Sequence, residues 1–133
     1  MTAHVVFSAI DPDAPATTSA TMVREVIRGF IGFRGLLMSD DVSMKALSGT
    51  IAERSRAAFA AGCDAVLHCN GDLAEMAQVA AEAPPLAGEA GQRADAALAQ
   101  RRAPEEFDVD AARTMFTQIV ASEQPSPQRK TGS

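Results

Sequence analysis

The 133-residue sequence has no long apolar run, few cysteines and no excess of positive charge. No stretch approaches the ~20 apolar residues that a membrane-spanning helix needs, which argues against a membrane segment. Its 17 acidic residues outnumber the 12 basic ones, and a net charge of −5 argues against nucleic acid and anionic membranes as partners. The start, MTAHVVFSAIDPD, lacks the features of a signal peptide, so we expect a cytoplasmic protein.

The two cysteines, Cys63 and Cys69, flank an expected strand. Six strand steps of ~3.3 Å separate them by roughly 20 Å, whereas a disulfide needs Cα atoms within about 7 Å. We therefore expect two free thiols, both in the core. The two histidines and two cysteines show no spacing typical of metal ligands, so we predict neither a metal nor a cofactor.

Three short apolar runs, starting near residues 4, 35 and 64, alternate with helical patterns. Ser19 can cap a helix to about Ile31, and Thr50 and Glu53 form a capping box for a helix that ends at Gly62. The stripe expected to be buried on the first helix comprises Met22, Val23, Val26, Ile27 and Phe30. A strand-to-strand period of about 30 residues suits parallel βαβ units in an α/β fold.

Three further helices are expected, over residues 72–82, 89–102 and 109–121. Pro84 and Pro85 end the first of them. The last segment, residues 122–133, has two prolines and almost no apolar residue, so it predicts a disordered tail after a domain that covers residues 1–121.

Two adjacent acids, Asp40 and Asp41, end the apolar run in RGLLMSDDVSM. Because side chains alternate along a strand, the two carboxylates should face opposite sides. One can face a site, while the other caps the following turn. The alternative, in which both are caps or solvated loop acids, stays open on spacing alone.

Other polar residues lie at equivalent places. His68 and Asn70 follow one expected strand, and His4 lies on another. Parallel α/β folds place their active sites at the carboxyl ends of strands, so these positions favour a functional site.

The segments FRGLLMSDDVSM, IAERS and AGCDAVLHCN, in this order, are similar to glycoside hydrolase family 3, and in particular to bacterial β-N-acetylhexosaminidases of cell-wall recycling. The resemblance covers about residues 1–70. It implies that Asp40 is the catalytic nucleophile of a retaining glycosidase and that Asp41 has the capping role. It also implies that His4 orients Asp40 or contacts the sugar, whereas His68, at a position that is usually aliphatic, receives no role.

The same resemblance places this chain in the last three βα units of a partial (β/α)8 TIM barrel, followed by extra helices. The substrate would be an N-acetylglucosamine-containing muropeptide or saccharide. The general acid, a histidine with an aspartate partner, and the sugar-binding residues would lie in the missing N-terminal half of the barrel. We therefore expect a truncated chain that is inactive alone.

Two alternatives remain. A small doubly wound binding or regulatory domain could use the acidic pair to hold Mg²⁺. Such a domain should have a lysine at a late strand end, but Lys45 is the only lysine in the first 129 residues and does not lie at a strand end. A decayed, nonfunctional remnant is the other alternative.

Overall fold

The computed structural model describes residues 1–122, which divide after Arg101 into two compact units. The first unit contains every strand and most of the helices; the second contains one helix. In chain order, the elements are η1 (Met22–Phe30), β1 (Met38–Asp41), α1 (Ile51–Ala61), β2 (Ala65–Leu67), α2 (Leu73–Glu82), α3 (Gly88–Ala99) and α4 (Val109–Ser122). The tail expected from residue 122 lies outside the described residues, except for Ser122, which ends α4.

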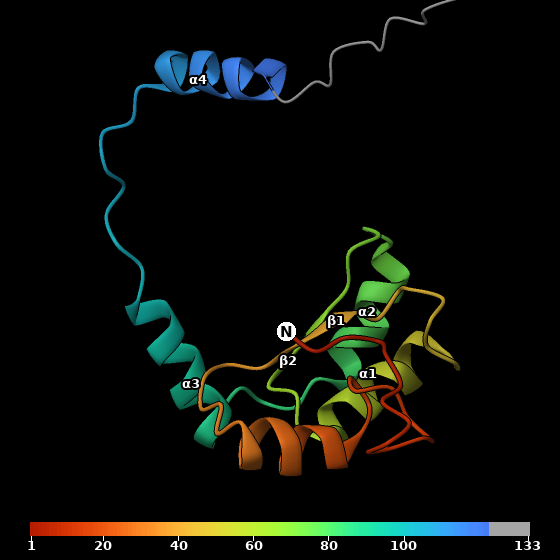
Figure 1. Cartoon of the computed structure of the whole chain (residues 1–133). Helices are drawn as coiled ribbons and strands as arrows, with labels where there is room; N and C mark the ends of the chain where they lie inside the picture. The colour runs from red at the N-terminus through yellow and green to blue at the C-terminus, as the bar shows by residue number, and fades with distance from the viewer. Residues whose placement is uncertain (123–133) are drawn as a thin grey trace, which may run out of the picture. The chain divides into compact units, whose positions relative to one another are not determined.

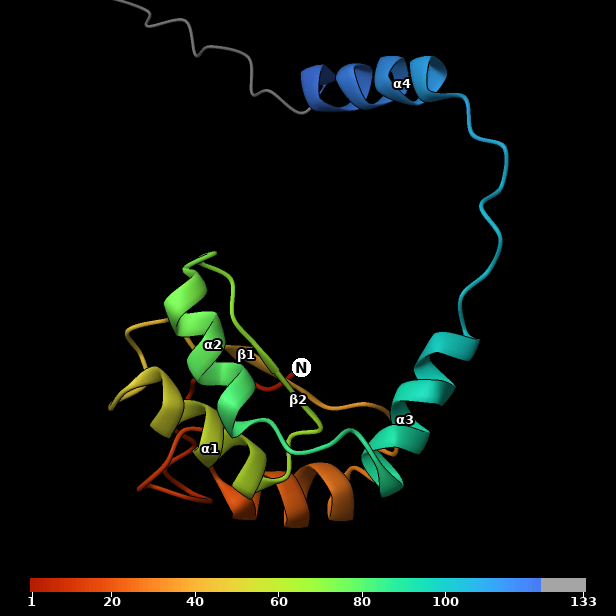
Figure 2. The ribbon, with the colours of Figure 1, turned by 180° about the vertical axis from the view of Figure 1, so that it is seen from behind.

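A parallel pair of strands forms the centre of the first unit. β1 and β2 pair side by side, and α1 connects them (Figure 1). α1 packs against both β2 and α2, which the view from behind also shows (Figure 2). The predicted α/β class with parallel strands is therefore confirmed.

Local signals begin and end α1 where the sequence predicts. The Thr50 hydroxyl accepts from the Glu53 amide, and the Glu53 carboxylate accepts from the Thr50 amide. Gly62 ends the helix with φ 115°, a conformation that favours glycine. A Cβ at this position would also lie 3.0 Å from the Val23 side chain, so a larger residue would press on the contact between α1 and η1.

The helix expected after Ser19 is present, and the Ser19 hydroxyl accepts from the Met22 amide at 3.0 Å. Its winding is of the wider π type. Met22 and Val23 are buried, as expected, but Phe30 is 91% exposed. The Phe30 prediction is wrong because a π turn takes more residues than an α turn, so a stripe spaced for an α-helix drifts off the buried face.

The strand expected near residue 4 does not form. The Thr2 amide donates to the Met38 carbonyl at 2.9 Å, as in a parallel ladder. The next ladder bond should join the Asp40 amide to the Thr2 carbonyl. Instead, the Asp40 amide donates to the Thr2 hydroxyl at 3.3 Å. The Thr2 hydroxyl thus replaces the backbone acceptor, and the N-terminal segment does not pair regularly with β1 beyond this point.

The two thiols are free, as predicted, but only Cys63 is buried. Burial raises the pKa of Cys63 to about 11, so its thiol stays protonated and unreactive near neutral pH. Cys69 is exposed, which corrects the expectation of a core position. β2 ends two residues earlier, at Leu67, so Cys69 lies beyond the packed part of the sheet.

A buried carboxylate joins four parts of the first unit. Asp64, whose side chain is 5% exposed, precedes β2 and pairs with Arg28 of η1 at 2.7 Å and with Arg93 of α3 at 2.9 Å. It also accepts from the Leu37 amide, just before β1, at 2.8 Å. Burial raises the pKa of Asp64, but these hydrogen bonds and the two guanidinium charges outweigh it and hold the pKa below the ordinary value.

The second unit contains α4, whose apolar side chains, including Met115 and Phe116, are exposed. Among residues 1–122, no helix is both long enough and apolar enough to cross a membrane.

Replacing Asp64 with asparagine should destabilise the first unit by on the order of 3 kcal/mol, because two guanidinium groups lose their shared carboxylate. Urea unfolding followed by circular dichroism measures this change. Asp95→Asn is the matched control, since Asp95 is an exposed acid on α3. Equal unfolding free energies for the two variants would contradict the structural role of Asp64.

The pH dependence of that difference follows from the lowered pKa of Asp64. A carboxyl whose pKa is lower in the folded state stabilises the fold fully above its unfolded pKa of about 3.9. This stabilisation is lost as pH falls through the lower folded pKa. We expect the stability gap between the natural chain and Asp64→Asn to be constant above pH ~5 and to shrink below pH ~4. A gap that shrinks already near pH 6 would assign the effect to another group.

Candidate active site

Asp40 lies at the carboxyl end of β1 and is half-buried. One of its carboxylate oxygens, Oδ1, accepts from the Asp41 amide at 2.8 Å. The other oxygen, Oδ2, accepts no hydrogen bond from residues 1–122. The carboxylate is therefore positioned by one backbone donor and keeps one oxygen available to a ligand.

Ser39 is completely buried and supports Asp40 through the backbone. Its hydroxyl donates to the Asp40 carbonyl at 2.7 Å and accepts from the Leu67 amide of β2 at 3.0 Å. The Ser39 hydroxyl therefore joins the two strands at the irregular register between Met38 and Asp41 and does not contact the Asp40 carboxylate.

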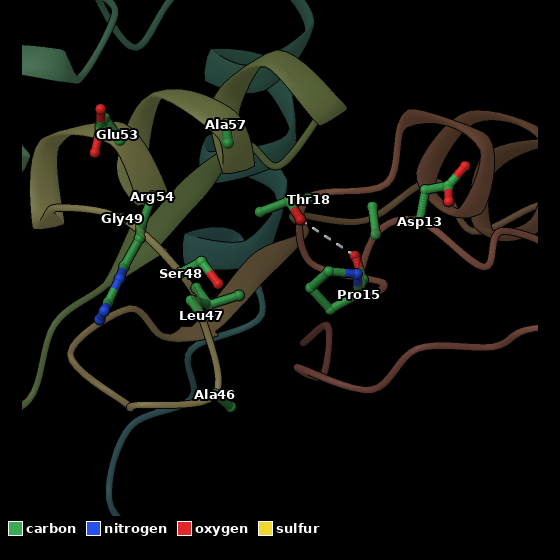
Figure 3. A pocket seen from close by; sticks show the side chains of 11 residues that line it. Asp13, Pro15, Thr18, Ala46, Leu47, Ser48, Gly49, Glu53, Arg54 and Ala57 are labelled. Atoms are coloured by element: carbon green, nitrogen blue, oxygen red, sulfur yellow. Dashed lines mark hydrogen bonds between the residues drawn. The ribbon is translucent and has the colours of Figure 1, made fainter.

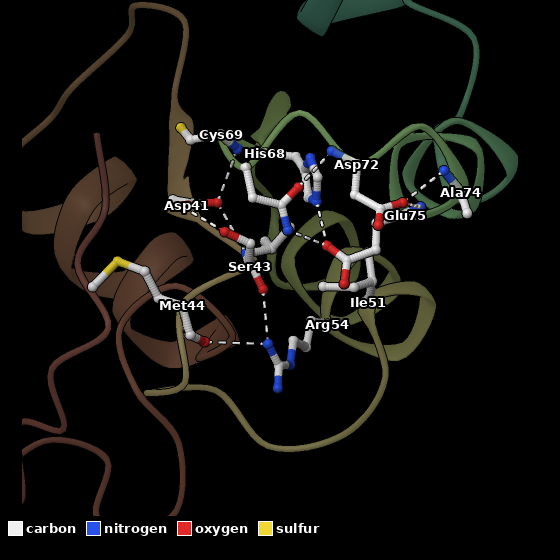
Figure 4. Close-up of polar contacts among 12 residues, drawn as sticks. Asp41, Ser43, Met44, Ile51, Arg54, His68, Cys69, Asp72, Ala74 and Glu75 are labelled. Carbon is white, nitrogen blue, oxygen red and sulfur yellow. Dashed lines mark hydrogen bonds and ion pairs between the residues drawn. The ribbon is translucent and has the colours of Figure 1, made fainter.

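Asp41 has the capping role predicted for one of the two acids. Its carboxylate accepts from the Ser43 amide at 2.9 Å, from the Ser43 hydroxyl at 2.6 Å and from the Cys69 amide at 3.2 Å (Figure 4). Partial burial raises the pKa of Asp41, but these hydrogen bonds, together with the nearby His68, hold it below the ordinary value. The carboxylate stays ionised and fixes the turn after β1 to the end of β2.

His4 contacts the backbone beside Asp40 and not its carboxylate. Its Nε2 lies 2.8 Å from the Asp41 carbonyl oxygen, and its Nδ1 lies 2.9 Å from the Thr17 hydroxyl. Both ring nitrogens thus have partners within this chain. His4 makes no contact with the Asp40 carboxylate, and the roles implied for it, orienting Asp40 or contacting the sugar, stay predictions.

His68 has partners that the sequence did not indicate. Its Nε2 pairs with Glu75 at 2.8 Å, and the Asn70 amide group donates to the same carboxylate oxygen (Figure 4). The hydrogen bonds from His68 and Asn70 hold the pKa of Glu75 below its ordinary value. Glu75 was missed because an acid in the first turn of a helix has a sufficient local explanation. Within residues 1–122, no three His, Cys, Asp or Glu side chains form a metal-binding cluster.

A cavity of about 530 Å³ lies apart from Asp40, between the loop before η1 and the start of α1 (Figure 3). Asp13, Thr18, Leu47, Glu53 and Arg54 are among its lining residues, and Asp40 is not. The Arg54 guanidinium also donates to the carbonyls of Val42 and Met44, so its position is fixed by the turn after β1.

The fold and the site describe an α/β protein with a carboxylate at the end of a parallel strand. Comparison with known proteins identifies the family of this α/β protein. Residues 1–101 match the family described as "Glycosyl hydrolase family 3 N terminal domain". The chain therefore belongs to glycosyl hydrolase family 3.

Curated relatives agree with this family. The chain is 37% identical over 112 residues, or 83% of its length, to a protein of Aromatoleum aromaticum named "Beta-hexosaminidase". It is 51% identical over 72 residues to a protein of Alkalilimnicola ehrlichii with the same name. The chain spans 31% of the first relative and 20% of the second.

Solved structures agree as well. A Zn-bound CbsA from Thermotoga neapolitana aligns with 98% of this chain and 31% of its own, at 26% identity and a TM-score of 0.64. A β-N-acetylhexosaminidase from Beutenbergia cavernae aligns with 73% of this chain and 32% of its own, at 31% identity and a TM-score of 0.52.

The different bonds of the two acids predict different effects on stability. Asp41→Asn should destabilise the chain by about 1 kcal/mol, because a neutral amide is a weaker acceptor for the three donors that it caps. Asp40→Asn should change the unfolding free energy by less than about 0.5 kcal/mol. Urea titrations of both variants test this, and a larger loss for Asp40→Asn would contradict the assignment of Asp41 as the cap.

Proposed function

We propose that this chain supplies the nucleophile of a retaining β-N-acetylhexosaminidase and that Asp40 is this nucleophile. The observation that carries the proposal is the Asp40 carboxylate at the end of β1, held by one backbone amide and with one oxygen free. Family membership and the hexosaminidase names of the relatives support the reaction type.

Asp40 would attack the anomeric carbon of a terminal N-acetylglucosamine residue. The carbon–oxygen bond to the leaving group breaks, the leaving oxygen takes a proton from a general acid, and a glycosyl ester forms on Asp40. Water, deprotonated by the same group, then attacks the anomeric carbon of that ester, and the bond from this carbon to the Asp40 oxygen breaks, which restores the carboxylate. Retention follows because the anomeric carbon is inverted twice.

We also propose that the chain forms the last three βα units of a (β/α)8 barrel. Its short parallel strands, its share of about a third or less of the relatives' lengths and its exposed apolar side chains support this. Val5, Phe7 and Phe33 are between 39% and 51% exposed. In this proposal, an N-terminal half of the barrel covers such side chains and provides the general acid and the sugar-binding residues.

The names of the same relatives support a proposal for the substrate class. We propose a saccharide or muropeptide with a terminal β-linked N-acetylglucosamine, as in cytoplasmic peptidoglycan recycling. A direct test uses a hybrid enzyme in which this chain replaces the matched segment of the Aromatoleum aromaticum relative. The release of N-acetylglucosamine by this hybrid is compared between purified muropeptides and chitin oligosaccharides of equal length, and release from chitin oligosaccharides alone would contradict the muropeptide proposal.

The purified 133-residue chain should release no measurable product from a chromogenic β-N-acetylglucosaminide. General acid catalysis alone contributes about 10²–10⁴-fold, and positioning of the sugar contributes more. Hydrolysis by this chain that disappears in Asp40→Asn would overturn the proposed dependence on a further half-barrel, because a second catalytic group would then lie within these residues.

A hybrid enzyme tests the role of Asp40. This chain would replace the matched 112-residue segment of the Aromatoleum aromaticum relative. Asp40→Asn should lower kcat at least about 10³-fold, because no glycosyl ester can form. Asp41→Asn, the matched control, should retain kcat within about tenfold. A fluorosugar inactivator should label Asp40, and labelling of any other residue would reassign the nucleophile.

A further inference from the structure

Four hydrogen bonds form a continuous chain around Asp40. The Asp40 amide donates to the Thr2 hydroxyl at 3.3 Å, and the Thr2 and Thr17 hydroxyls lie 2.9 Å apart. The Thr17 hydroxyl lies 2.9 Å from His4 Nδ1, and His4 Nε2 lies 2.8 Å from the Asp41 carbonyl. The chain of bonds therefore starts at the backbone N–H of Asp40 and ends at the carbonyl of the next residue.

In the neutral imidazole, the donors and acceptors fix the direction of every bond. The Asp41 carbonyl can only accept, so His4 Nε2 must carry the ring proton. His4 Nδ1 is then bare and accepts from the Thr17 hydroxyl. Thr17 has no second proton, so it accepts from the Thr2 hydroxyl, whose oxygen in turn accepts from the Asp40 amide. Each hydroxyl donates once and accepts once, and no donor is left over.

We propose that Thr2, Thr17 and His4 form a positioning network for Asp40, an inference that rests on its proposed role as nucleophile. The network holds the backbone on both sides of the Asp40 carboxylate without touching the carboxylate itself. Its members are positioning residues, since none contacts the reacting atoms. Thr2 and His4 belong to the segment whose regular strand pairing is lost, and Thr17 lies in the loop before η1. The Thr2 hydroxyl replaces the backbone acceptor that a regular strand would supply to the Asp40 amide.

Burial makes these bonds costly to replace. Thr17 is 0% exposed and Thr2 is 8% exposed, so water has little access to either hydroxyl. Removing the Thr17 hydroxyl leaves the Thr2 proton and His4 Nδ1 without partners at once. The backbone at Asp40 would then relax toward other donors and acceptors, and a displacement near 1 Å is enough to slow an attack about 10²-fold.

The first experiment needs no enzyme activity. In the ¹⁵N-histidine-labelled 133-residue chain at pH ~8, ¹H–¹⁵N correlation spectra should show His4 with a protonated Nε2 and a bare Nδ1. His4→Gln assigns its signals against those of His68. Thr17→Val should shift the His4 Nδ1 signal, whereas Thr17→Ser, which keeps the hydroxyl, should preserve it. A protonated Nδ1 in the natural chain, or no shift in Thr17→Val, would overturn the network.

The second experiment uses the same hybrid enzyme. Thr17→Val should lower kcat about 10- to 100-fold with little change in KM, and Thr17→Ser should restore kcat to within about threefold of the parent. Thr18→Val is the matched control, because the Thr18 hydroxyl bonds only the Pro15 carbonyl and lies outside the network. A kcat in Thr17→Val equal to that of the control, or a change in KM alone, would overturn the positioning role.

The two possible failures are distinguishable. Retained activity in Asp40→Asn removes the proposed function, whatever the threonine variants do. Activity that is lost in Asp40→Asn but unchanged in Thr17→Val removes only the network.

Discussion

The structure of the first unit depends on the buried carboxylate of Asp64. This single side chain holds η1 through Arg28, α3 through Arg93 and the approach to β1 through the Leu37 amide. Arg28 also donates to the carbonyls of Phe33 and Gly35, so the loop between η1 and β1 is fixed from both of its ends. Val23 of η1, Leu37 before β1 and Ala61 of α1 form a hydrophobic cluster beside these contacts. The ion pairs and the Leu37 amide bond fix the approach to β1, and hence where Asp40 is placed.

Around Asp40, side-chain hydroxyls make hydrogen bonds that backbone groups would make in a regular sheet. Thr2 accepts the Asp40 amide on one side of β1, and Ser39 accepts the Leu67 amide on the other. A regular ladder would make the same bonds between carbonyls and amides, with the side chains left free. Side-chain bonds can follow an irregular backbone, and β1 has such an irregularity between Met38 and Asp41. The carboxyl end of the strand can therefore be bent without leaving buried donors unpaired.

The sequence predicted those features whose causes are local. Thr50 and Glu53 lie three residues apart, and this spacing predicted their capping box. The residue types at Gly62 and Asp72 likewise predicted the end of α1 and the start of α2. The parallel pairing of β1 and β2 followed from the period of the apolar runs. Features that depend on distant partners were missed. Asp64 meets residues 27, 29 and 36 positions away, and nothing in its neighbourhood distinguishes it from a solvated acid. The predicted burial of Phe30 was wrong because no residue type indicates π-helical winding.

The same reasoning separates the two adjacent acids. The Asp41 carboxylate accepts three hydrogen bonds, which satisfy both of its oxygens and lower its basicity. A carboxylate bound in this way is a good cap and a poor nucleophile, because an attack would have to break bonds that hold the turn. The Asp40 carboxylate accepts one bond, from the next amide, and its second oxygen is free. The neighbouring hydroxyls bind the backbone of Asp40 instead of its side chain, so they fix its direction without lowering its reactivity. The two adjacent aspartates thus differ in reactivity for one reason: three donors bind the Asp41 carboxylate, whereas the hydroxyls near Asp40 bind its backbone.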